Sequence, residues 1–395
     1  MNTLDIEKLR KDTPGCQNIL HFNNAGASLS PTPVVNAVKA YLDLETTTGG
    51  YEAAQAEAAT IEKFYDHAAA LINCSRDEIA FVENATRGFD MAFYSFKFKK
   101  GDRIITALCE YASNYLAFLH AAKHTGVTID VIRNDESGQL DIDDLQKKLD
   151  NNVKLIAITH VPSQGGLVNP AEEVGKIANK WNIPYILDAT QSVGQMPIDV
   201  QAIGCDFLCT TGRKYLRGPR GTGFLYARKS IIEQSDPPFI DLHAATWTKD
   251  DAYELRTDAR RFETWEQNIA AKIGLSKALR YAHEIGLPNI RYRIQHLADY
   301  LRTKLTEIPG IDVCDLGKTK CGIVTFTCKN KSAQAVQQAL AKHKINVSVS
   351  LQEYARLDLA KRHLDALVRA SVHYYNTEDE VDRFCQTLHN VIKAL

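Results

Sequence analysis

Long apolar runs are absent from this sequence. No stretch of 18 or more apolar residues occurs, and this excludes a membrane-spanning helix. The first ten residues are charged and hold no apolar segment of the kind that a secretory signal needs. Lys and Arg (47) nearly balance Asp and Glu (48), the net charge is −1, and no long basic run occurs. We therefore expect no nucleic-acid partner and no membrane partner.

Cysteine is present, but its spacing excludes two common uses. The nine cysteines are dispersed, their number is odd, and no Cys-x-x-Cys pair occurs. This pattern argues against a disulfide framework and against a structural metal site, so we expect no bound metal. It favours a reducing, cytoplasmic compartment in which most cysteines are small buried hydrophobic residues.

Short apolar runs alternate with helical patterns over the first 285 residues. Predicted helices, for instance 142–150 and 171–181, separate predicted strands at 79–82, 103–108, 128–133, 153–159 and 185–187. This alternation predicts an α/β fold with a mainly parallel sheet. Ligands bind such sheets at the carboxyl ends of the strands. We therefore expect one site to gather the polar residues that follow strand ends, which are Thr86, Glu110, His160, Asp188 and Lys214.

The pattern changes after Gly286, where helices and strands suit a smaller α+β unit. The predicted helices are 287–307, 332–343 and 377–394, and the predicted strands are 311–314, 322–328 and 345–349. We predict a large domain over residues 16–285 and a small domain formed by residues 1–15 and 286–395. No internal repeat or low-complexity linker is present.

A Gly-rich loop at 210–223 carries Lys214 among hydroxyls and cations, between predicted strands at 207–210 and 223–226. A lysine beside an anion cradle suits an enzyme that forms a Schiff base with an aldehyde cofactor and holds its phosphate. The alternative is a phosphate site without covalent chemistry, or a surface turn.

Asp188 ends a strongly apolar strand, 26 residues before Lys214. A buried carboxylate needs a cationic partner, and a protonated pyridine nitrogen is one. The alternative is a helix N-cap, since Ala189, Thr190 and Gln191 follow.

Three further segments have a functional and a purely structural interpretation. Asn84-Ala85-Thr86 opens a helix that can bind phosphate, or is a plain helix cap. Tyr111 can stack on a flat cofactor ring, or pack in the core. Arg369 offers a fork to a substrate carboxylate, or makes a surface salt bridge.

Together and in this order, these motifs resemble the class V aminotransferase family, whose members are fold type I enzymes dependent on pyridoxal 5′-phosphate (PLP). The resemblance extends from Phe22-Asn23-Asn24-Ala25-Gly26 to Asn376-Thr377. It implies an α/β large domain with a mainly parallel seven-stranded sheet and a smaller C-terminal α+β domain. It also implies a homodimer with active sites at the interface.

The resemblance assigns roles to individual residues. It implies that Lys214 forms the Schiff base with PLP and moves the Cα proton, while Asp188 pairs with the pyridinium nitrogen. Tyr111 takes the ring-stacking place that is often His. The other implied cofactor contacts are Gln191 to the phenolic oxygen and, around the phosphate, Asn84, Ala85, Thr86, Thr211 and Arg213. The implied substrate carboxylate contacts are Arg369 and Asn24.

One segment of the resemblance concerns the partner subunit. Arg261-Phe262-Glu263-Thr264 is similar to the stretch that reaches the partner's phosphate, but Trp265-Glu266 replaces the usual Gly-Thr. Whether Thr264 or a neighbour makes this contact is left open by the sequence.

The chemistry is limited to Cα reactions of an amino acid: β-elimination, transamination, epimerisation or cysteine desulfuration. Desulfuration in this family needs a nucleophilic cysteine shortly before the carboxylate-binding arginine. Residues 346–356 contain none, and Cys328 falls in a predicted strand. The resemblance points to a branch that includes hercynylcysteine sulfoxide lyases and isopenicillin-N-epimerase-like proteins. We therefore favour C–S β-elimination from a cysteine conjugate, giving pyruvate and ammonia.

Several alternatives stay open at this point. The alternative is a class V aminotransferase, or an epimerase, that acts on a small amino acid. A non-catalytic PLP-binding regulator is disfavoured by the intact set of Lys214, Asp188 and Arg369. A Rossmann nucleotide-binding protein is disfavoured because no Gly-x-Gly-x-x-Gly follows the first strand. The substrate side chain is not readable, although four residues suit its pocket: Ser163, Gln164, Tyr354 and Arg356.

Overall fold

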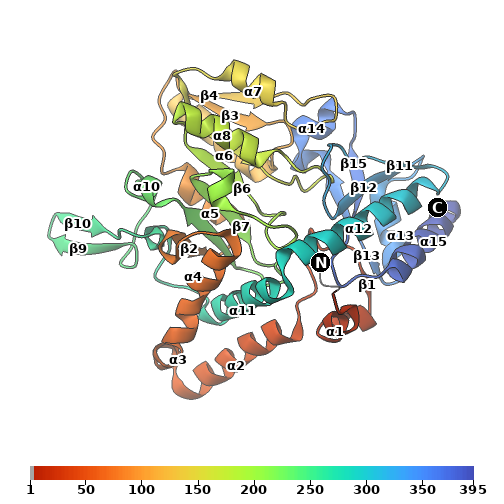
Figure 1. Cartoon of the computed structure of the whole chain (residues 1–395), viewed down its shortest axis with the longest axis horizontal. Helices are drawn as coiled ribbons and strands as arrows, with labels where there is room; N and C mark the ends of the chain where they lie inside the picture. Colours follow the sequence, from red (N-terminus) through yellow and green to blue (C-terminus); the bar gives the residue numbers. More distant parts are fainter. Residues whose placement is uncertain (1–3) are drawn as a thin grey trace.

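A seven-stranded sheet forms the centre of the chain (Figure 1). The structure is a computed structural model that describes residues 4–395. The strand order is β2–β8–β7–β6–β5–β3–β4, and β8 is antiparallel to both its neighbours while the other pairs are parallel. The strands are β2 (Ile79–Val82), β3 (Arg103–Ala107), β4 (Thr128–Ile132), β5 (Val153–Thr159), β6 (Tyr185–Asp188), β7 (Phe207–Thr211) and β8 (Gly223–Ala227). The predicted fold, an α/β architecture with a mainly parallel sheet, is confirmed.

Side chains of the central strands alternate between two hydrophobic clusters. Ile156 and Leu187 belong to one cluster, whereas their neighbours Leu155 and Ile186 belong to the other. Both faces are therefore buried, as expected for parallel strands connected by helices. The connecting helices are α5 (Ala85–Phe93), α6 (Ala112–Thr125), α7 (Ile142–Lys148), α8 (Ala171–Trp181) and α9 (Val200–Ile203), and α10 (Lys229–Ile232) follows β8.

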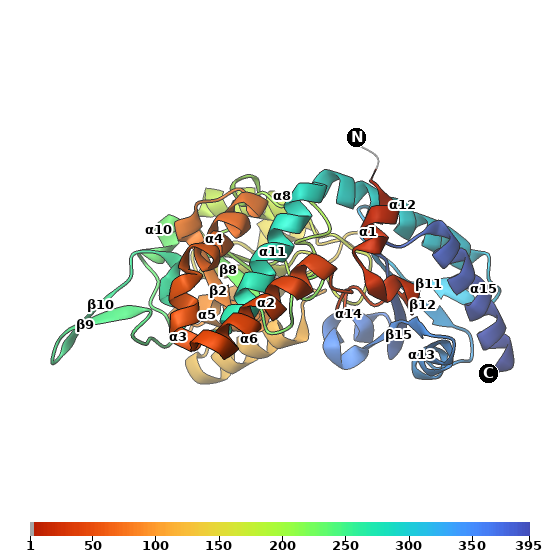
Figure 2. The ribbon, with the colours of Figure 1, turned by 90° about the horizontal axis from the view of Figure 1, so that it is seen from below.

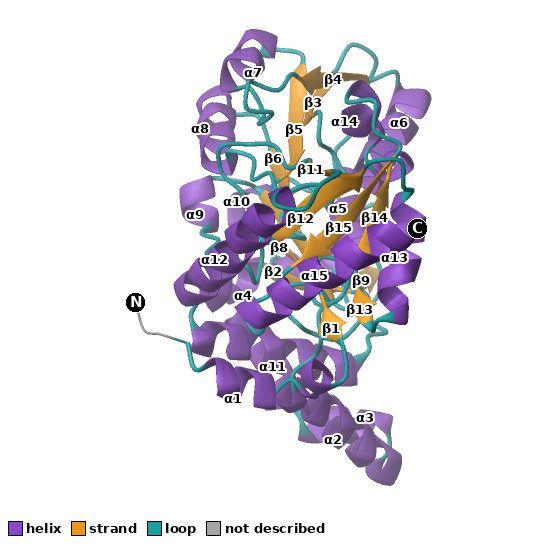
Figure 3. Cartoon of the chain, turned by 90° about the vertical axis from the view of Figure 1, so that its right-hand side faces the viewer, coloured by secondary structure: helices purple, strands orange, loops and turns teal. Residues whose placement is uncertain are grey.

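The C-terminal part contains a four-stranded antiparallel sheet of order β11–β12–β15–β14. These strands are β11 (Ile311–Val313), β12 (Ile323–Cys328), β14 (Ser348–Leu351) and β15 (Ala366–Ser371). Figure 3 shows three long helices beside this sheet, α12 (Leu287–Thr306), α13 (Ala333–Lys342) and α15 (Glu378–Ala394), and a shorter one, α14 (Arg356–Lys361), lies near β14 in sequence. The elements expected after Gly286 are therefore present.

One predicted strand in this part is divided. The stretch expected at 345–349 forms β13 (Ile345–Asn346), which pairs in parallel with β1 (Leu20–His21), and then β14. The N-terminal strand thus lies against the C-terminal part of the chain. The division into residues 16–285 and residues 1–15 with 286–395 stays a prediction.

The remaining helices and a projecting hairpin complete the molecule. The helices are α1 (Ile6–Lys11), α2 (Thr32–Thr48), α3 (Gly50–Ala56), α4 (Ala58–Ile72) and α11 (Ile269–Ile285), with short 3₁₀ turns at Pro14–Gln17, Arg76–Glu78, Ala259–Phe262 and Gln352–Tyr354. The hairpin β9 (Ala245–Lys249) and β10 (Ala252–Leu255) extends away from the body (Figures 1 and 2). Among residues 4–395, no helix has the length and apolar character needed to cross a membrane.

Candidate active site

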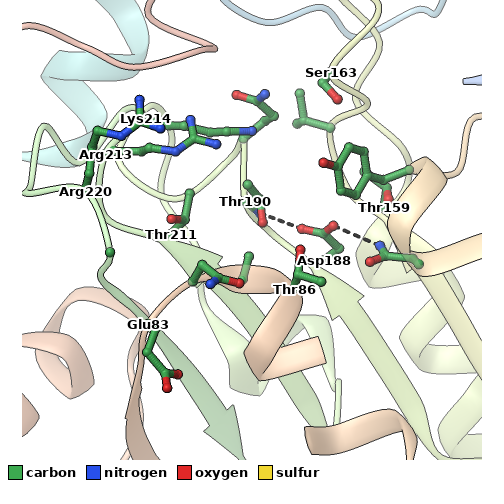
Figure 4. Close-up of a pocket in the computed structure, with 17 residues that line it drawn as sticks. Glu83, Thr86, Thr159, Ser163, Asp188, Thr190, Thr211, Arg213, Lys214 and Arg220 are labelled. Carbon is green, nitrogen blue, oxygen red and sulfur yellow. Dashed lines mark hydrogen bonds between the residues drawn. The ribbon is translucent and has the colours of Figure 1, made fainter. Parts of the chain in front are cut away.

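A cavity of about 410 Å³ lies where the parallel strands end. Its walls come from the segments after β2, β3, β5, β6 and β7, so residues distant in sequence meet there (Figure 4). All nine residues assigned to the cofactor from the sequence line it: Asn84, Ala85, Thr86, Tyr111, Asp188, Gln191, Thr211, Arg213 and Lys214. The cavity thus lies at the carboxyl ends of the strands. Of the five strand-end residues expected to meet there, Thr86, Asp188 and Lys214 line it, whereas Glu110 and His160 do not.

Lys214 lies on the loop between β7 and β8 and is buried. Burial, and the positive charges of Arg213 and Arg369, lower the pKa of the Lys214 amine to about 7, although Asp188 acts in the opposite direction. A large fraction of this amine is therefore neutral near pH 7. A neutral amine is the form that attacks an aldehyde carbon.

Asp188 ends β6 and is buried within the cavity wall. One carboxylate oxygen accepts from the backbone N–H of Thr190 at 2.9 Å, and the other accepts from Nδ2 of Asn114 at 2.9 Å (Figure 4). Donors from two segments therefore hold both oxygens of this carboxylate in place. Asp188 thus presents a fixed negative charge to the cavity, which suits a cationic ring nitrogen.

An anion-binding end of the cavity is formed by the start of α5. Asn84 is the N-cap, since its side-chain oxygen accepts from the N–H of Arg87 at 2.9 Å, and Thr86 lies in the first turn. The N-terminus of a helix this long attracts phosphate through its free N–H groups. Thr211 and Arg213 line the same cavity. Arg213 also donates to the backbone oxygen of Gly26, which ties the lysine loop to the N-terminal segment.

Two polar atoms of the wall test whether the site suits PLP. Thr190 Oγ1 and Gln191 Oε1 are buried and, within the described residues, have no hydrogen-bond partner. Buried polar atoms are normally paired, so two unpaired ones on a cavity wall point to a polar ligand. Together with a carboxylate, an amine and a helix N-terminus, they fit a phosphorylated, hydroxylated pyridine aldehyde.

Tyr111 is half-buried at the N-cap of α6 and lines the cavity. It shares the cavity wall with Asp188 and Thr159, and this placement is compatible with stacking on a flat ring. Its stacking role stays a prediction.

Arg369, on β15 of the C-terminal sheet, is not among the lining residues but contacts one of them. Its Nη1 donates to the backbone oxygen of Ser163 at 2.9 Å, and Ser163 lines the cavity. The Nε atom of Arg369 is buried without a partner among the described residues. Burial lowers the pKa of Arg369 to about 10, so the guanidinium stays charged at neutral pH. A buried cation with a free donor is suited to an incoming carboxylate.

The geometry differs from the expectation for Asn24. Both ends of the Asn24 amide are used within the protein, because Oδ1 accepts from Tyr375 and Nδ2 donates to the backbone oxygens of Ser371 and His21. Its neighbour Asn23 instead faces Arg369, with Oδ1 3.4 Å from Nη2. This arrangement favours Asn23 over Asn24 for a place next to a bound carboxylate.

Other predicted residues lie outside the cavity. His160 pairs with Ser192 Oγ at 3.0 Å and lines a separate groove, and burial lowers the pKa of its imidazole to about 4. Gln164, Tyr354 and Arg356 are not among the lining residues. Thr264 is not either, and its hydroxyl donates to the backbone oxygen of Glu266.

Sequence reasoning missed several lining residues, including Asn114, Thr159, Thr190 and Arg220. Asn114 was recognisable in principle, because it follows Tyr111 by three residues on the same helix and therefore shares its face. Arg220 lies in the same Gly-rich loop as Lys214.

Known proteins resemble this chain over nearly its whole length. The family model "Aminotransferase class-V" matches residues 20–384. A probable cysteine desulfurase of Pyrococcus abyssi is 32% identical over 98% of both chains, and one of Methanothermobacter thermautotrophicus is 29% identical over 98% of both. The apo structure of a cysteine desulfurase from Thermococcus onnurineus NA1 is 30% identical, covers 100% of both chains and has a TM-score of 0.93.

These findings confirm the family and change the expected branch. The relatives bear the name cysteine desulfurase, rather than hercynylcysteine sulfoxide lyase or isopenicillin-N-epimerase-like protein. PLP is the cofactor of this family, so the predicted cofactor is confirmed. The chain belongs to the class V aminotransferase family of PLP-dependent enzymes.

Proposed function

We propose that this enzyme cleaves the C–S bond of a cysteine conjugate by β-elimination. This reaction releases the sulfur-containing fragment and aminoacrylate, and water then hydrolyses aminoacrylate to pyruvate and ammonia. The observation that carries this proposal is a cavity that contains an amine, a carboxylate and cations, and no cysteine among its lining residues. A site of this composition supports removal of the Cα proton without a protein thiol to accept sulfur.

PLP supplies an electron-accepting ring that stabilises negative charge at the substrate Cα. The neutral amine of Lys214 accepts the Cα proton, and its pKa of about 7 suits a group that takes up and returns a proton near neutrality. When PLP is bound, Asp188 would hold a negative charge toward the ring nitrogen. Arg369 binds the substrate α-carboxylate, and the start of α5 with Thr86, Thr211 and Arg213 binds the phosphate.

Two cysteines, one after β3 and one at the end of β12, are poor nucleophiles. Cys109 follows β3 but is fully buried, and burial raises the pKa of its thiol well above the ordinary value. Cys328 ends β12, as predicted, opposite Ile311, and burial raises the pKa of its thiol to about 11. A thiolate, not a thiol, attacks sulfur, so neither residue suits the role of sulfur acceptor.

The relatives favour a second candidate, desulfuration of free cysteine. Their names state that activity for proteins about 30% identical to this chain. With no lining cysteine, the sulfur would have to pass to a thiol outside the chain. Transamination and epimerisation remain further alternatives, and each reaction has a distinct product.

The decisive experiment uses the PLP-loaded enzyme, a cysteine S-conjugate sulfoxide and no keto-acid acceptor. Catalytic pyruvate and ammonia in equal amounts support β-elimination. A parallel reaction with L-cysteine and dithiothreitol would give alanine and sulfide if desulfuration is the activity. Conversion only when a keto acid is added would indicate transamination, and loss of optical purity alone would indicate epimerisation. Lys214→Ala is the matched inactive control.

We also propose that the enzyme acts as a homodimer. Four apolar side chains on or near the projecting hairpin are exposed: Leu242, Trp247, Tyr253 and Trp265. Large exposed apolar side chains grouped in this way are typical of association surfaces. A monomer mass by light scattering at micromolar concentration would contradict the dimer.

A further inference from the structure

Behind the cavity, one amide connects two buried carboxylates. Asn114 Nδ2 donates to Glu110 Oε1 at 2.9 Å and to Asp188 Oδ2 at 2.9 Å. Glu110 follows β3, Asn114 lies in the first turn of α6, and Asp188 ends β6. Only the amino group of an asparagine can donate to two acceptors, so the orientation of this side chain is determined by its partners.

Glu110 is held more firmly than Asp188. Its side chain is 4% exposed and accepts from five donors. These are Thr106 Oγ1 at 3.0 Å, the N–H of Tyr111 at 2.9 Å, Asn114 Nδ2, and both the N–H and the hydroxyl of Thr159. Because β3, β5 and α6 all contribute, Glu110 is a rigid anchor for Asn114.

The two carboxylates repel one another. Their nearest oxygens share one nitrogen neighbour, so they lie within about 6 Å of one another, where charges interact strongly in a protein interior. Burial raises the pKa of Glu110 to about 7, and the charge of Asp188 adds to this effect, while the donors from Thr159 and Asn114 oppose it. A cation placed against Asp188 relieves this repulsion.

We propose that Glu110 and Asn114 are positioning residues that hold Asp188 toward the ring nitrogen of PLP, and that the charge of Glu110 strengthens protonation of the bound cofactor. Asn114 fixes one oxygen of Asp188 through its amide. Glu110 fixes Asn114 and, once it is ionised, adds a second negative charge behind the first. The inference depends on the cofactor of the family and not on which reaction follows, so failure of the proposed β-elimination would leave it intact.

The test uses Glu110→Gln and Asn114→Leu, which preserve side-chain size. Asp144→Asn is the control, because Asp144 is equally buried and accepts a backbone N–H, but lies on α7 away from the cavity. Each apoprotein is checked by thermal unfolding. PLP is then titrated to obtain its dissociation constant, and the visible absorption of the bound cofactor is recorded against pH.

Both substitutions are expected to weaken PLP binding about tenfold, the usual effect of losing a hydrogen bond to a charged group. Glu110→Gln should also move the absorption transition of the bound cofactor to lower pH by about one unit, since removing an anion disfavours nearby protonation. Asp144→Asn should change neither value. A merely structural role would lower the unfolding temperature without moving this transition.

The proposal is overturned if folded Glu110→Gln has the parent's PLP affinity and the parent's transition pH. If Glu110→Gln does not fold, Asn114→Leu decides the matter. Parental affinity in that variant would show that Asp188 needs no such support.

Discussion

Arg369 and Ser163, 206 residues apart, are joined by a 2.9 Å hydrogen bond from the guanidinium Nη1 to the backbone oxygen. The bond connects β15 of the C-terminal sheet with the loop after β5 of the central sheet. It places a buried cation beside the cavity that contains Lys214. The residues proposed to bind substrate and those proposed to bind cofactor thus come from different sheets, and the distance between them depends on how these sheets pack.

Replacement of Lys214 by Ala should abolish turnover and leave the fold intact. The Lys214 amine is the only group assigned both to cofactor attachment and to proton transfer, so turnover should need it. The fold should stay intact, because the packing of the central sheet does not depend on this amine. Turnover and borohydride-trapped cofactor, measured by mass spectrometry, are the readouts. Lys393→Ala, at an exposed position, is the control, and measurable turnover in Lys214→Ala would contradict the assignment.

Asp188→Asn should lower kcat by at least about 10²-fold, in line with the loss of one preorganised charge interaction. Asparagine preserves the shape but cannot neutralise a cationic ring nitrogen. Steady-state kinetics under saturating PLP separate this effect from weaker cofactor binding. A variant with parental kcat would mean that Asp188 is only a structural cap.

Arg369→Gln should reduce kcat/KM about a hundredfold, and Arg369→Lys about tenfold, mainly through KM. The guanidinium offers two parallel donors to a carboxylate, glutamine offers no charge, and lysine offers charge without the fork. Kinetics with the preferred amino acid and with its amide derivative give the test. If both variants preferred the amino acid over its amide by the same kcat/KM ratio as the parent, the proposed role of Arg369 in carboxylate binding would be wrong.

The rate of PLP capture by the apoenzyme should rise with pH through about 7. The Lys214 pKa is lowered from 10.5 to about 7, so the reactive neutral amine is formed well below the ordinary range. Between pH 7 and pH 10.5 the Lys214 amine is mostly protonated in the unfolded chain and mostly neutral in the folded one. The unfolded state therefore binds more protons in this range, and the free energy of unfolding of the apoprotein should increase as pH rises through it. Stopped-flow absorbance checks the rate, and a midpoint near 10 would refute the shift.

Acid unfolding should depend strongly on Glu263. This carboxylate is fully buried and accepts from the N–H of Phe81, Tyr65 Oη and His243 Nε2. Although burial opposes it, Lys272 and these donors lower the pKa of Glu263 from 4.5 to about 2. The group therefore contributes about 3 kcal/mol above pH 4.5, and this is lost as pH falls toward 2.

The dependence of stability on Glu263 is checked by measuring the free energy of unfolding in urea between pH 2 and pH 6. Glu263→Gln should be less stable near neutrality and should show a flatter pH profile than the parent. Glu353→Gln, at an exposed position, serves as the comparison. Equal slopes for the parent and for Glu263→Gln would show that other carboxylates dominate acid unfolding.

Much of the fold was predictable because its signals are local. The alternation of apolar strands with helices predicts the parallel sheet, and β5 (Val153–Thr159) and α8 (Ala171–Trp181) form with the expected bounds. The break between β13 and β14 was not predictable. The break follows from pairing of Ile345 with Leu20, which lies 325 residues earlier. The residues around Ile345 do not indicate which distant segment pairs with them.

The sequence by itself determined the order of strands and helices, the loop that carries Lys214, the carboxylate of Asp188 and, through motif resemblance, the cofactor. Only the tertiary structure decided which strand-end residues share the cavity. In the folded chain His160 pairs with Ser192 outside the cavity that contains Lys214. The amide of Asn24 is hydrogen-bonded within the protein, and Asn114 connects Glu110 to Asp188. The physical reason is that secondary structure and residue chemistry follow from neighbours in the chain. Hydrogen-bond partners and burial follow from packing between segments that the chain order leaves far apart.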